Sequence, residues 1–142
     1  MDSIHYHYVV DGDDFSRAGE ASSSLKSKLK QLGFPPEVIR RCSIAIYEGE
    51  INMAIHADGG DIDVDIYPDK ILMVLKDRGP GIPDIDLAMQ AGWSTAKEQI
   101  HDLGFGAGMG LPNMKKSSDE MSIETEIGVG TTVTMQINVT NP

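Results

Sequence analysis

The sequence has a single cysteine and no long apolar run. Cys42 alone cannot form an internal disulfide, which suits a reducing cytoplasm, and its apolar helical surroundings predict that it lies in the core. No stretch approaches the roughly 20 apolar residues that a membrane span needs, and no signal peptide opens the chain. These absences predict a cytoplasmic protein without a membrane anchor.

Basic residues are also scarce, with 12 Lys and Arg against 22 Asp and Glu and a formal net charge of −10. This imbalance makes nucleic acid and anionic membrane surfaces poor direct partners. A phosphate ligand would have to be held by backbone amides, a few cations and a metal ion. At 142 residues the chain is most simply one domain, residues 1–142, with a single core.

Apolar periodicity predicts an α/β fold. Alternation predicts strands at residues 6–10, 61–66, 122–127 and 132–139, and a continuous apolar run predicts a central strand at 71–75. Helical spacing predicts helices over 14–32 and from about 35 to 57, and a shorter one beginning near 111. Strands with one solvated face imply a mostly antiparallel mixed sheet, with helices on the other face. The expected architecture is a two-layer sandwich.

Four glycines alternate with other residues between Gly104 and Gly110, and the next residues begin the short helix. Glycine is favoured where backbone adopts positive φ or approaches a ligand closely. Backbone N–H groups of such a loop, followed by a helix N-terminus, favour an anion, most often phosphate. A mobile linker is the alternative interpretation.

The second predicted helix carries Glu48, Asn52 and His56 at a spacing of four residues, so that all three project from one face. A carboxylate and a carboxamide at this spacing can meet one hydrated Mg²⁺, and the carboxylate could accept a proton from an attacking hydroxyl. A plain polar stripe is the alternative, and His56 alone is more often a helix-end residue. Gly49 costs about 1 kcal/mol in a helix and suggests close contact with the sheet or a nucleotide.

Two further motifs follow predicted strands. Asp77 ends the central strand and precedes Gly79 and Gly81, so its carboxylate could accept a hydrogen bond from an exocyclic amine while a flat ring lies against glycine backbone. A tight turn is the alternative. Residues 128–132 form a Gly-Val-Gly-Thr-Thr turn into the last strand, whose hydroxyls could face a ligand or simply begin a hairpin.

Taken together and in this order, the four motifs resemble the ATP-binding domain of the GHKL superfamily, which includes gyrase-type ATPases, histidine kinases and anti-sigma serine kinases. Residues 48–56 resemble its N box, 77–81 its first glycine box, 106–111 its second, and 130–132 its Gly-Thr-Thr element. The resemblance spans roughly residues 5–140.

The resemblance implies that Asp77 binds the adenine amino group of ATP or ADP and that Asn52, with Glu48, holds Mg²⁺ against the phosphates. The glycine run would cover the triphosphate, Thr132 would lie near adenine, and Lys115 or Lys116 would reach a phosphate. The predicted nucleotide-binding residues are Asn52, His56, Asp77, Gly79, Gly81, Ile82, Gly104, Gly106, Ala107, Gly108, Met109, Gly110, Leu111, Lys115 and Thr132.

Within the superfamily, a domain of this size with Glu, Asn and His in the N box is similar to the anti-sigma serine/threonine kinases. There the residue matching Glu48 is the general base for a serine of a small anti-anti-sigma (STAS-type) partner, and the kinase also binds a sigma factor, commonly as a homodimer. Two alternatives stay open: an ATP/ADP-sensing module without phosphotransfer, and a stand-alone histidine-kinase ATPase domain.

The only tryptophan, Trp93, lies between the two glycine boxes in a polar segment. We expect this segment to be a lid that closes when ATP and Mg²⁺ bind, moving Trp93 to a less polar setting. A permanent anchor in the core is the alternative.

Overall fold

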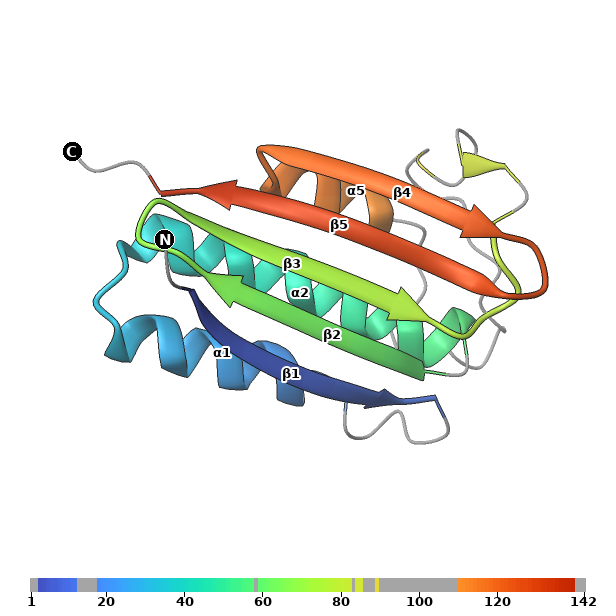
Figure 1. Cartoon of the computed structure of the whole chain (residues 1–142), viewed down its shortest axis with the longest axis horizontal. Helices are drawn as coiled ribbons and strands as arrows, with labels where there is room; N and C mark the ends of the chain where they lie inside the picture. Colours follow the sequence, from blue (N-terminus) through green and yellow to red (C-terminus); the bar gives the residue numbers. More distant parts are fainter. Residues whose placement is uncertain are drawn as a thin grey trace.

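The computed structural model describes residues 3–12, 18–57, 59–82, 84–85, 89 and 110–139. Figure 1 shows the arrangement of the chain. Its elements are β1 (Ile4–Asp11), α1 (Glu20–Gln31), α2 (Pro36–His56), β2 (Gly59–Ile66), β3 (Lys70–Asp77), α5 (Gly110–Ser117), β4 (Glu120–Glu126) and β5 (Gly130–Asn138).

The five strands form one sheet in the order β1-β2-β3-β5-β4. Every strand pair in the described part of the chain is antiparallel, so the parallel component of the predicted mixed sheet is not found there. The continuous apolar segment that predicts a central strand is β3, and it does lie in the middle of the sheet. Strand alternation places Ile62, Val64 and Ile66 of β2 in the core.

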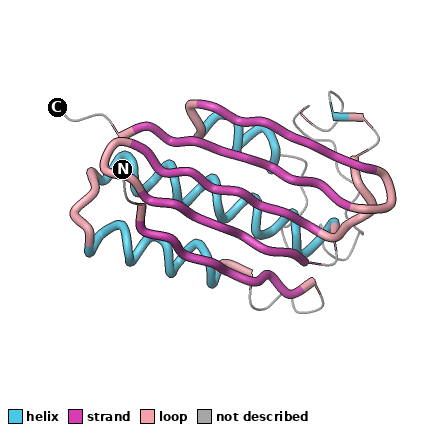
Figure 2. Tube along the Cα trace, in the orientation of Figure 1, coloured by secondary structure: helices cyan, strands magenta, loops and turns pink. Residues whose placement is uncertain are grey.

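The helices pack on one face of this sheet (Figures 1 and 2), which confirms the predicted two-layer α/β sandwich. Helix α2 runs behind the centre of the sheet and contacts both α1 and α5. Its inward face supplies Cys42, Ala45 and Ile46, which are fully buried. Burial of the Cys42 thiol raises its pKa to about 12, so Cys42 is the core residue that the sequence predicts.

Gly49 lets α2 approach the sheet closely, as its place in a helix suggests. A Cβ at this position would collide with the Leu75 Cδ2 of β3 and lie 3.2 Å from the Met114 Cε of α5. Leu75 and Met114 are both buried, so neither can move away into solvent. The helix-propensity cost of glycine is therefore offset by the close packing of three elements.

The first helix begins later than predicted. Gly19 has a φ of 105°, in the left-handed region, and the backbone N–H of Ser23 donates to its carbonyl. Helix α1 therefore begins at Glu20, and a continuous helix from residue 14 is wrong because left-handed backbone cannot lie inside a right-handed helix. None of the helices in the described part of the chain is long and apolar enough to cross a membrane.

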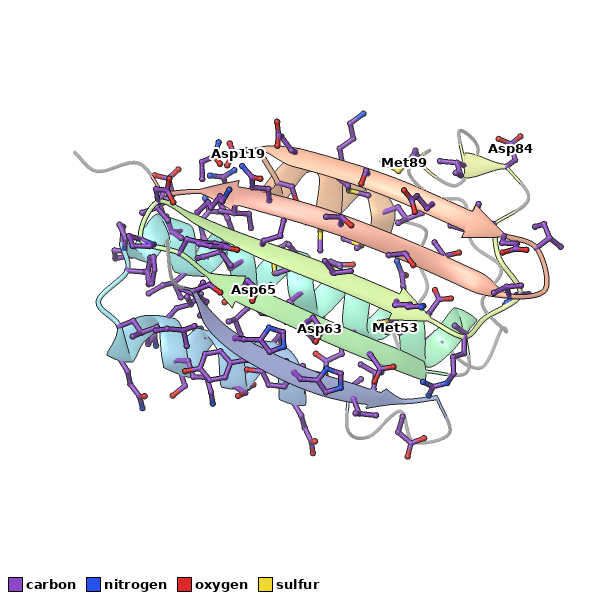
Figure 3. The ribbon with its side chains drawn as sticks, in the orientation of Figure 1. Met53, Asp63, Asp65, Asp84, Met89 and Asp119 are labelled. Atoms are coloured by element: carbon purple, nitrogen blue, oxygen red, sulfur yellow. The ribbon has the colours of Figure 1, made fainter. Side chains whose placement is uncertain are left out.

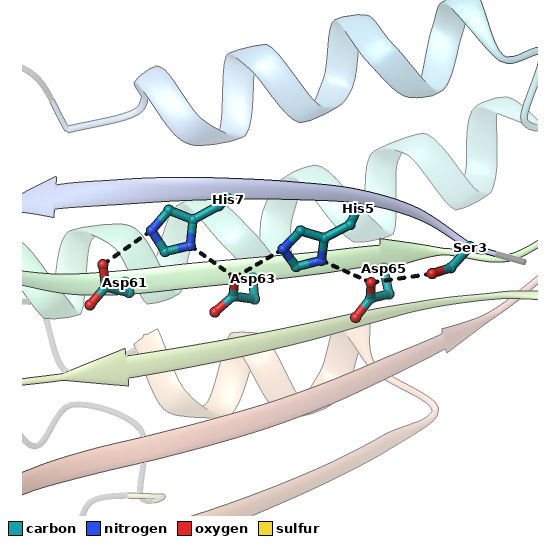
Figure 4. A network of polar contacts seen from close by, with 6 residues as sticks. All are labelled: Ser3, His5, His7, Asp61, Asp63 and Asp65. Atoms are coloured by element: carbon teal, nitrogen blue, oxygen red, sulfur yellow. Dashed lines mark hydrogen bonds and ion pairs between the residues drawn. The ribbon is translucent and has the colours of Figure 1, made fainter.

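The other face of the sheet carries an exposed ladder of histidines and aspartates (Figures 3 and 4). His5 Nδ1 lies 2.9 Å from Asp65 Oδ1, and His5 Nε2 lies 3.2 Å from Asp63 Oδ1. His7 repeats the pattern one step along β1, at 2.8 Å from Asp63 and 3.3 Å from Asp61. The carboxylates raise the pKa of both imidazoles, chiefly through the side-chain hydrogen bonds. We refer to these five residues as the His–Asp ladder.

Candidate active site

Glu48 and Asn52 lie one turn apart on α2, toward α5. The Glu48 carboxylate is half-buried, and burial raises its pKa. The side chain of Asn113 on α5 opposes this shift through a hydrogen bond to the carboxylate. Since an acid with a raised pKa holds a proton more tightly, Glu48 is a stronger base than an exposed glutamate.

Asn52 meets the beginning of α5. Its Nδ2 lies 3.8 Å from the Met114 Sδ, and a Cβ at Gly110 would lie 2.7 Å from its Oδ1. The last glycine of the predicted phosphate loop therefore has its backbone against the carboxamide of the N-box asparagine. The motifs at 48–52 and 110 are about 60 residues apart in sequence, and the fold brings them together.

These side chains suit a hydrated magnesium ion. Glu48 and Asn52 offer oxygen atoms on one helix face, which is the donor type that Mg²⁺ prefers. The described residues contain no cluster of three or more His, Cys, Asp or Glu able to hold a metal by themselves. Mg²⁺ in proteins commonly keeps several waters, so two oxygen donors on one helix face suit it.

Asp77 ends β3 on the face of the sheet that carries the helices. Its Oδ1 accepts two backbone hydrogen bonds, from Gly79 N at 3.0 Å and from Thr131 N at 2.9 Å. Its Oδ2 receives no hydrogen bond from the described residues. The carboxylate thus caps the turn after β3, which agrees with the tight turn given as the alternative interpretation of this motif. It also keeps one acceptor oxygen of the kind that an exocyclic amine needs.

The loop after β3 fits closely against its neighbours. A Cβ at Gly79 would lie 2.6 Å from the Ala57 Cβ at the end of α2. Gly81 has a φ of 88°, and a Cβ there would lie 2.8 Å from the Glu126 carbonyl oxygen. Both predicted glycines therefore lie where a side chain would displace backbone. Ile82, the fourth predicted loop residue, donates its N–H to Thr125 Oγ1 at 2.8 Å.

Of the two threonines in the closing motif, Thr131 is the one that meets Asp77. Thr132 pairs with Lys76 and Glu124 in the sheet, and its side chain lies on the face away from the helices. The place of Thr132 near adenine stays a prediction, whereas Thr131 of the same motif is the residue whose backbone N–H meets Asp77. Strand alternation indicates that Thr131 faces the helices, because it is two residues before Val133 and both lie on the core face.

Glu50 is a second residue that the sequence interpretation did not place. It is 3 % exposed, and its carboxylate accepts hydrogen bonds from the backbone N–H groups of Ala21 at 2.9 Å and Ser22 at 3.2 Å. Both N–H groups lie in the first turn of α1, where they have no partner within the helix and a negative charge is favourable. Glu50 therefore fastens α1 to the helix that carries Glu48 and Asn52.

The remaining predicted residues lie either on α5 or outside the described part of the chain. Leu111 packs partly buried against the core, and Lys115 and Lys116 are exposed in the last turn of α5, away from its N-terminal end at Gly110. The residues outside the described part of the chain are Gly104, Gly106, Ala107, Gly108, Met109 and the Trp93 segment. The side chain of His56, at the end of α2, is likewise outside it. The lid and triphosphate-loop expectations stay predictions.

Comparison with known proteins identifies the class to which this fold and site belong. Residues 38–141 match the family described as histidine kinase-, DNA gyrase B- and HSP90-like ATPases. The chain belongs to this family, and the GHKL resemblance of its motifs is confirmed.

Among curated proteins, the chain is 34 % identical over 108 residues to the serine/threonine-protein kinase RsbT of Bacillus subtilis, covering 73 % of this chain and 75 % of RsbT. It is 33 % identical over 99 residues to the anti-sigma F factor of Caldanaerobacter subterraneus, covering 70 % of this chain and 62 % of that protein. It is 31 % identical to the anti-sigma F factor of Geobacillus kaustophilus, covering 84 % and 82 %. The anti-sigma kinase branch is thus the part of the family to which it is related.

A solved structure gives the same fold. The crystal structure of the RsbU and RsbW domains of a Mycobacterium tuberculosis protein superposes with a TM-score of 0.68 at 18 % identity. The match covers 98 % of this chain but 33 % of that longer one. At this identity the likeness supports the fold alone.

Proposed function

We propose that this protein is an ATP-dependent serine/threonine kinase of the anti-sigma regulatory type. It transfers the γ-phosphate of ATP to a serine of an anti-anti-sigma (STAS-type) partner and thereby regulates a sigma factor. The relatives named above support this branch of the family. The observation that carries the proposal is that α5 meets α2 at both N-box side chains: Asn113 hydrogen-bonds Glu48, and Gly110 lies against the carboxamide of Asn52.

The nucleotide is held by residues from both ends of the site. Asp77 accepts the adenine amino group through Oδ2, while its Oδ1 stays bound to backbone. Asn52 and Glu48 would hold Mg²⁺, whose charge would offset the negative charge of the phosphates. The glycine run that ends at Gly110 supplies backbone N–H groups to the triphosphate.

Glu48 acts as the general base. Phosphoryl transfer depends mainly on positioning and charge stabilisation, with a base to take the proton from the attacking hydroxyl. The half-buried carboxylate has a raised pKa, which favours accepting that proton, and Asn113 orients it. A serine hydroxyl of the partner within hydrogen-bond reach of Glu48 would pass its proton to the carboxylate as its oxygen attacks the γ-phosphorus. The bond from that phosphorus to the bridging oxygen would break, and ADP would leave.

We further propose that the protein acts in the cytoplasm as a homodimer, without direct contact with nucleic acid or membrane. Its net charge of −10 supports the last point, because both of those partners are anionic. A single buried thiol agrees with a reducing compartment.

The proposal is tested by incubating labelled ATP with the protein and small STAS-type domains. Glu48→Gln should still bind ATP but transfer phosphate roughly 10²–10⁴-fold more slowly, because shape is kept and the base is lost. Glu37→Gln, at an exposed position in the first turn of the same helix, is the matched control and should transfer at the wild-type rate.

Asn52→Ala should weaken only the Mg²⁺-dependent part of ATP binding. Undiminished transfer by Glu48→Gln would remove the base assignment. Nucleotide binding without transfer to any partner would favour the sensing module, and label on histidine would favour a histidine-kinase domain.

A further inference from the structure

The hydroxyl of Thr125 on β4 is shared by three segments of the chain. Its Oγ1 accepts the backbone N–H of Ile82 at 2.8 Å and lies 2.9 Å from the Oγ1 of Thr131, its cross-strand partner on β5. It also lies 3.5 Å from the Gly130 carbonyl. Thr125 thus joins β4, β5 and the loop after β3 beside Asp77, although it belongs to none of the four sequence motifs.

The number of protons in this network limits its arrangement. A threonine hydroxyl has one proton to donate. In the 2.9 Å contact between Thr125 Oγ1 and Thr131 Oγ1 either hydroxyl can be the donor, and Thr125 is also placed to donate to the Gly130 carbonyl at 3.5 Å. In the arrangement in which Thr125 donates to Thr131, the proton of the Thr131 hydroxyl is left to donate to a further group.

Thr131 also lies against the carboxylate of Asp77, because its backbone N–H donates to Oδ1. In this arrangement the site presents a carboxylate oxygen that no described residue hydrogen-bonds, next to a hydroxyl donor. Adenine carries an amino donor next to a ring-nitrogen acceptor, which matches this pair. Guanine carries a carbonyl acceptor next to a ring N–H donor, which opposes it.

We propose that Thr125 is a positioning residue of the purine site, which holds Ile82 in place and orients the Thr131 hydroxyl as a donor, so that the site prefers adenine to guanine. This inference rests on the proposed function, because it takes Asp77 as the residue that meets the purine. Thr125 itself touches no nucleotide; it acts through Ile82 and Thr131.

The test compares Thr125→Val, which keeps the shape and removes the hydroxyl, with Thr125→Ser, which keeps the hydroxyl. Thr134→Val, on the outer face of β5, is the matched control. Calorimetry should show ADP affinity about three- to tenfold weaker in Thr125→Val, with a smaller preference for ADP over GDP. Thr125→Ser and Thr134→Val should stay within about twofold of wild type.

A second measurement needs no nucleotide. In the free protein the amide of Ile82 should exchange slowly with solvent in wild type and in Thr125→Ser, and faster in Thr125→Val, because the acceptor is gone. Should Thr125→Val not fold, Thr125→Cys replaces it, since a thiol of similar size is a poor hydrogen-bond partner.

The outcomes separate the two proposals. Wild type that binds ADP, together with a hydroxyl-free variant of equal affinity and unchanged ADP/GDP preference, would overturn the role of Thr125 alone. Wild type that binds neither nucleotide would overturn the proposed function and this inference with it.

Discussion

Asp77 and the three aspartates of the His–Asp ladder lie on opposite faces of one sheet. Asp77 is partly buried on the helix side and accepts hydrogen bonds from fixed backbone N–H groups. Asp63, by contrast, has a side chain 42 % exposed to solvent and is paired with two histidines that are themselves about half exposed. A carboxylate held by backbone cannot rearrange, whereas the ladder is screened by water and its partners are free to turn.

The contrast separates buried carboxylates that are bound to backbone N–H groups from exposed carboxylates that are paired with side chains. Glu50 belongs with Asp77, since it too accepts two backbone N–H groups and is almost fully buried. Glu48 lies between the extremes, half-buried and held by one side chain. Four measurements, given in order of decreasing effect, test this ordering of the carboxylates.

Asp77→Asn should weaken ATP and ADP binding alike by about ten- to a hundredfold, because it removes a charged acceptor worth about 1.5–3 kcal/mol. Calorimetry on both nucleotides measures the loss. Asp63→Asn, a matched change in the ladder, should leave both affinities as in wild type. Equal affinities in wild type and Asp77→Asn would remove Asp77 from the nucleotide site and leave it as a turn cap.

Glu50→Ala should lower the free energy of unfolding by about 1–3 kcal/mol, because it leaves the N–H groups of Ala21 and Ser22 buried without an acceptor. Asp63→Ala should change it by no more than about 0.5 kcal/mol. Denaturant unfolding of both variants gives the comparison. Similar losses of unfolding free energy in the two variants would mean that burial does not determine how much each carboxylate stabilises the fold.

Asn113→Ala should move the acid limb of the transfer rate to higher pH. The hydrogen bond from Asn113 lowers the pKa of Glu48, so its removal leaves burial to raise that pKa unopposed. A base is active only when deprotonated, and a higher pKa requires a higher pH. A pH–rate profile of wild type and Asn113→Ala measures the shift of the acid limb. An acid limb at the same pH in both proteins would show that Asn113 does not influence the pKa of Glu48.

The ladder should give the smallest effect, visible only through pH. Because the folded-state pKa values of His5 and His7 are raised above 6.5, the ladder stabilises the fold fully below that value and less as pH rises through the raised values. Melting temperatures from about pH 5.5 to about pH 8.5, compared between wild type and a His5→Gln/His7→Gln variant, isolate this contribution. A pH-independent difference between the two proteins would contradict it.

Local periodicity predicted most of the fold. The alternation of residues 61–66 and 132–139 fixed which side chains face the core, and the four-residue spacing of Glu48 and Asn52 put both on one helix face. The same alternation would have indicated Thr131 rather than Thr132 at the Asp77 end of the sheet. These are properties of a single helix or strand, so they can be read from neighbouring residues.

The side chains that support the site from outside the motifs depend on how the elements pack. Thr125 meets Ile82 across 43 residues of sequence, Glu50 meets Ser22 across 28, and Asn113 comes from a helix far along the chain from Glu48. No periodicity connects such pairs, because each contact depends on how whole elements pack. The family, the layers and the nucleotide motifs can therefore be read from the order of the amino acids, whereas the partners that hold the motif residues in place follow from packing.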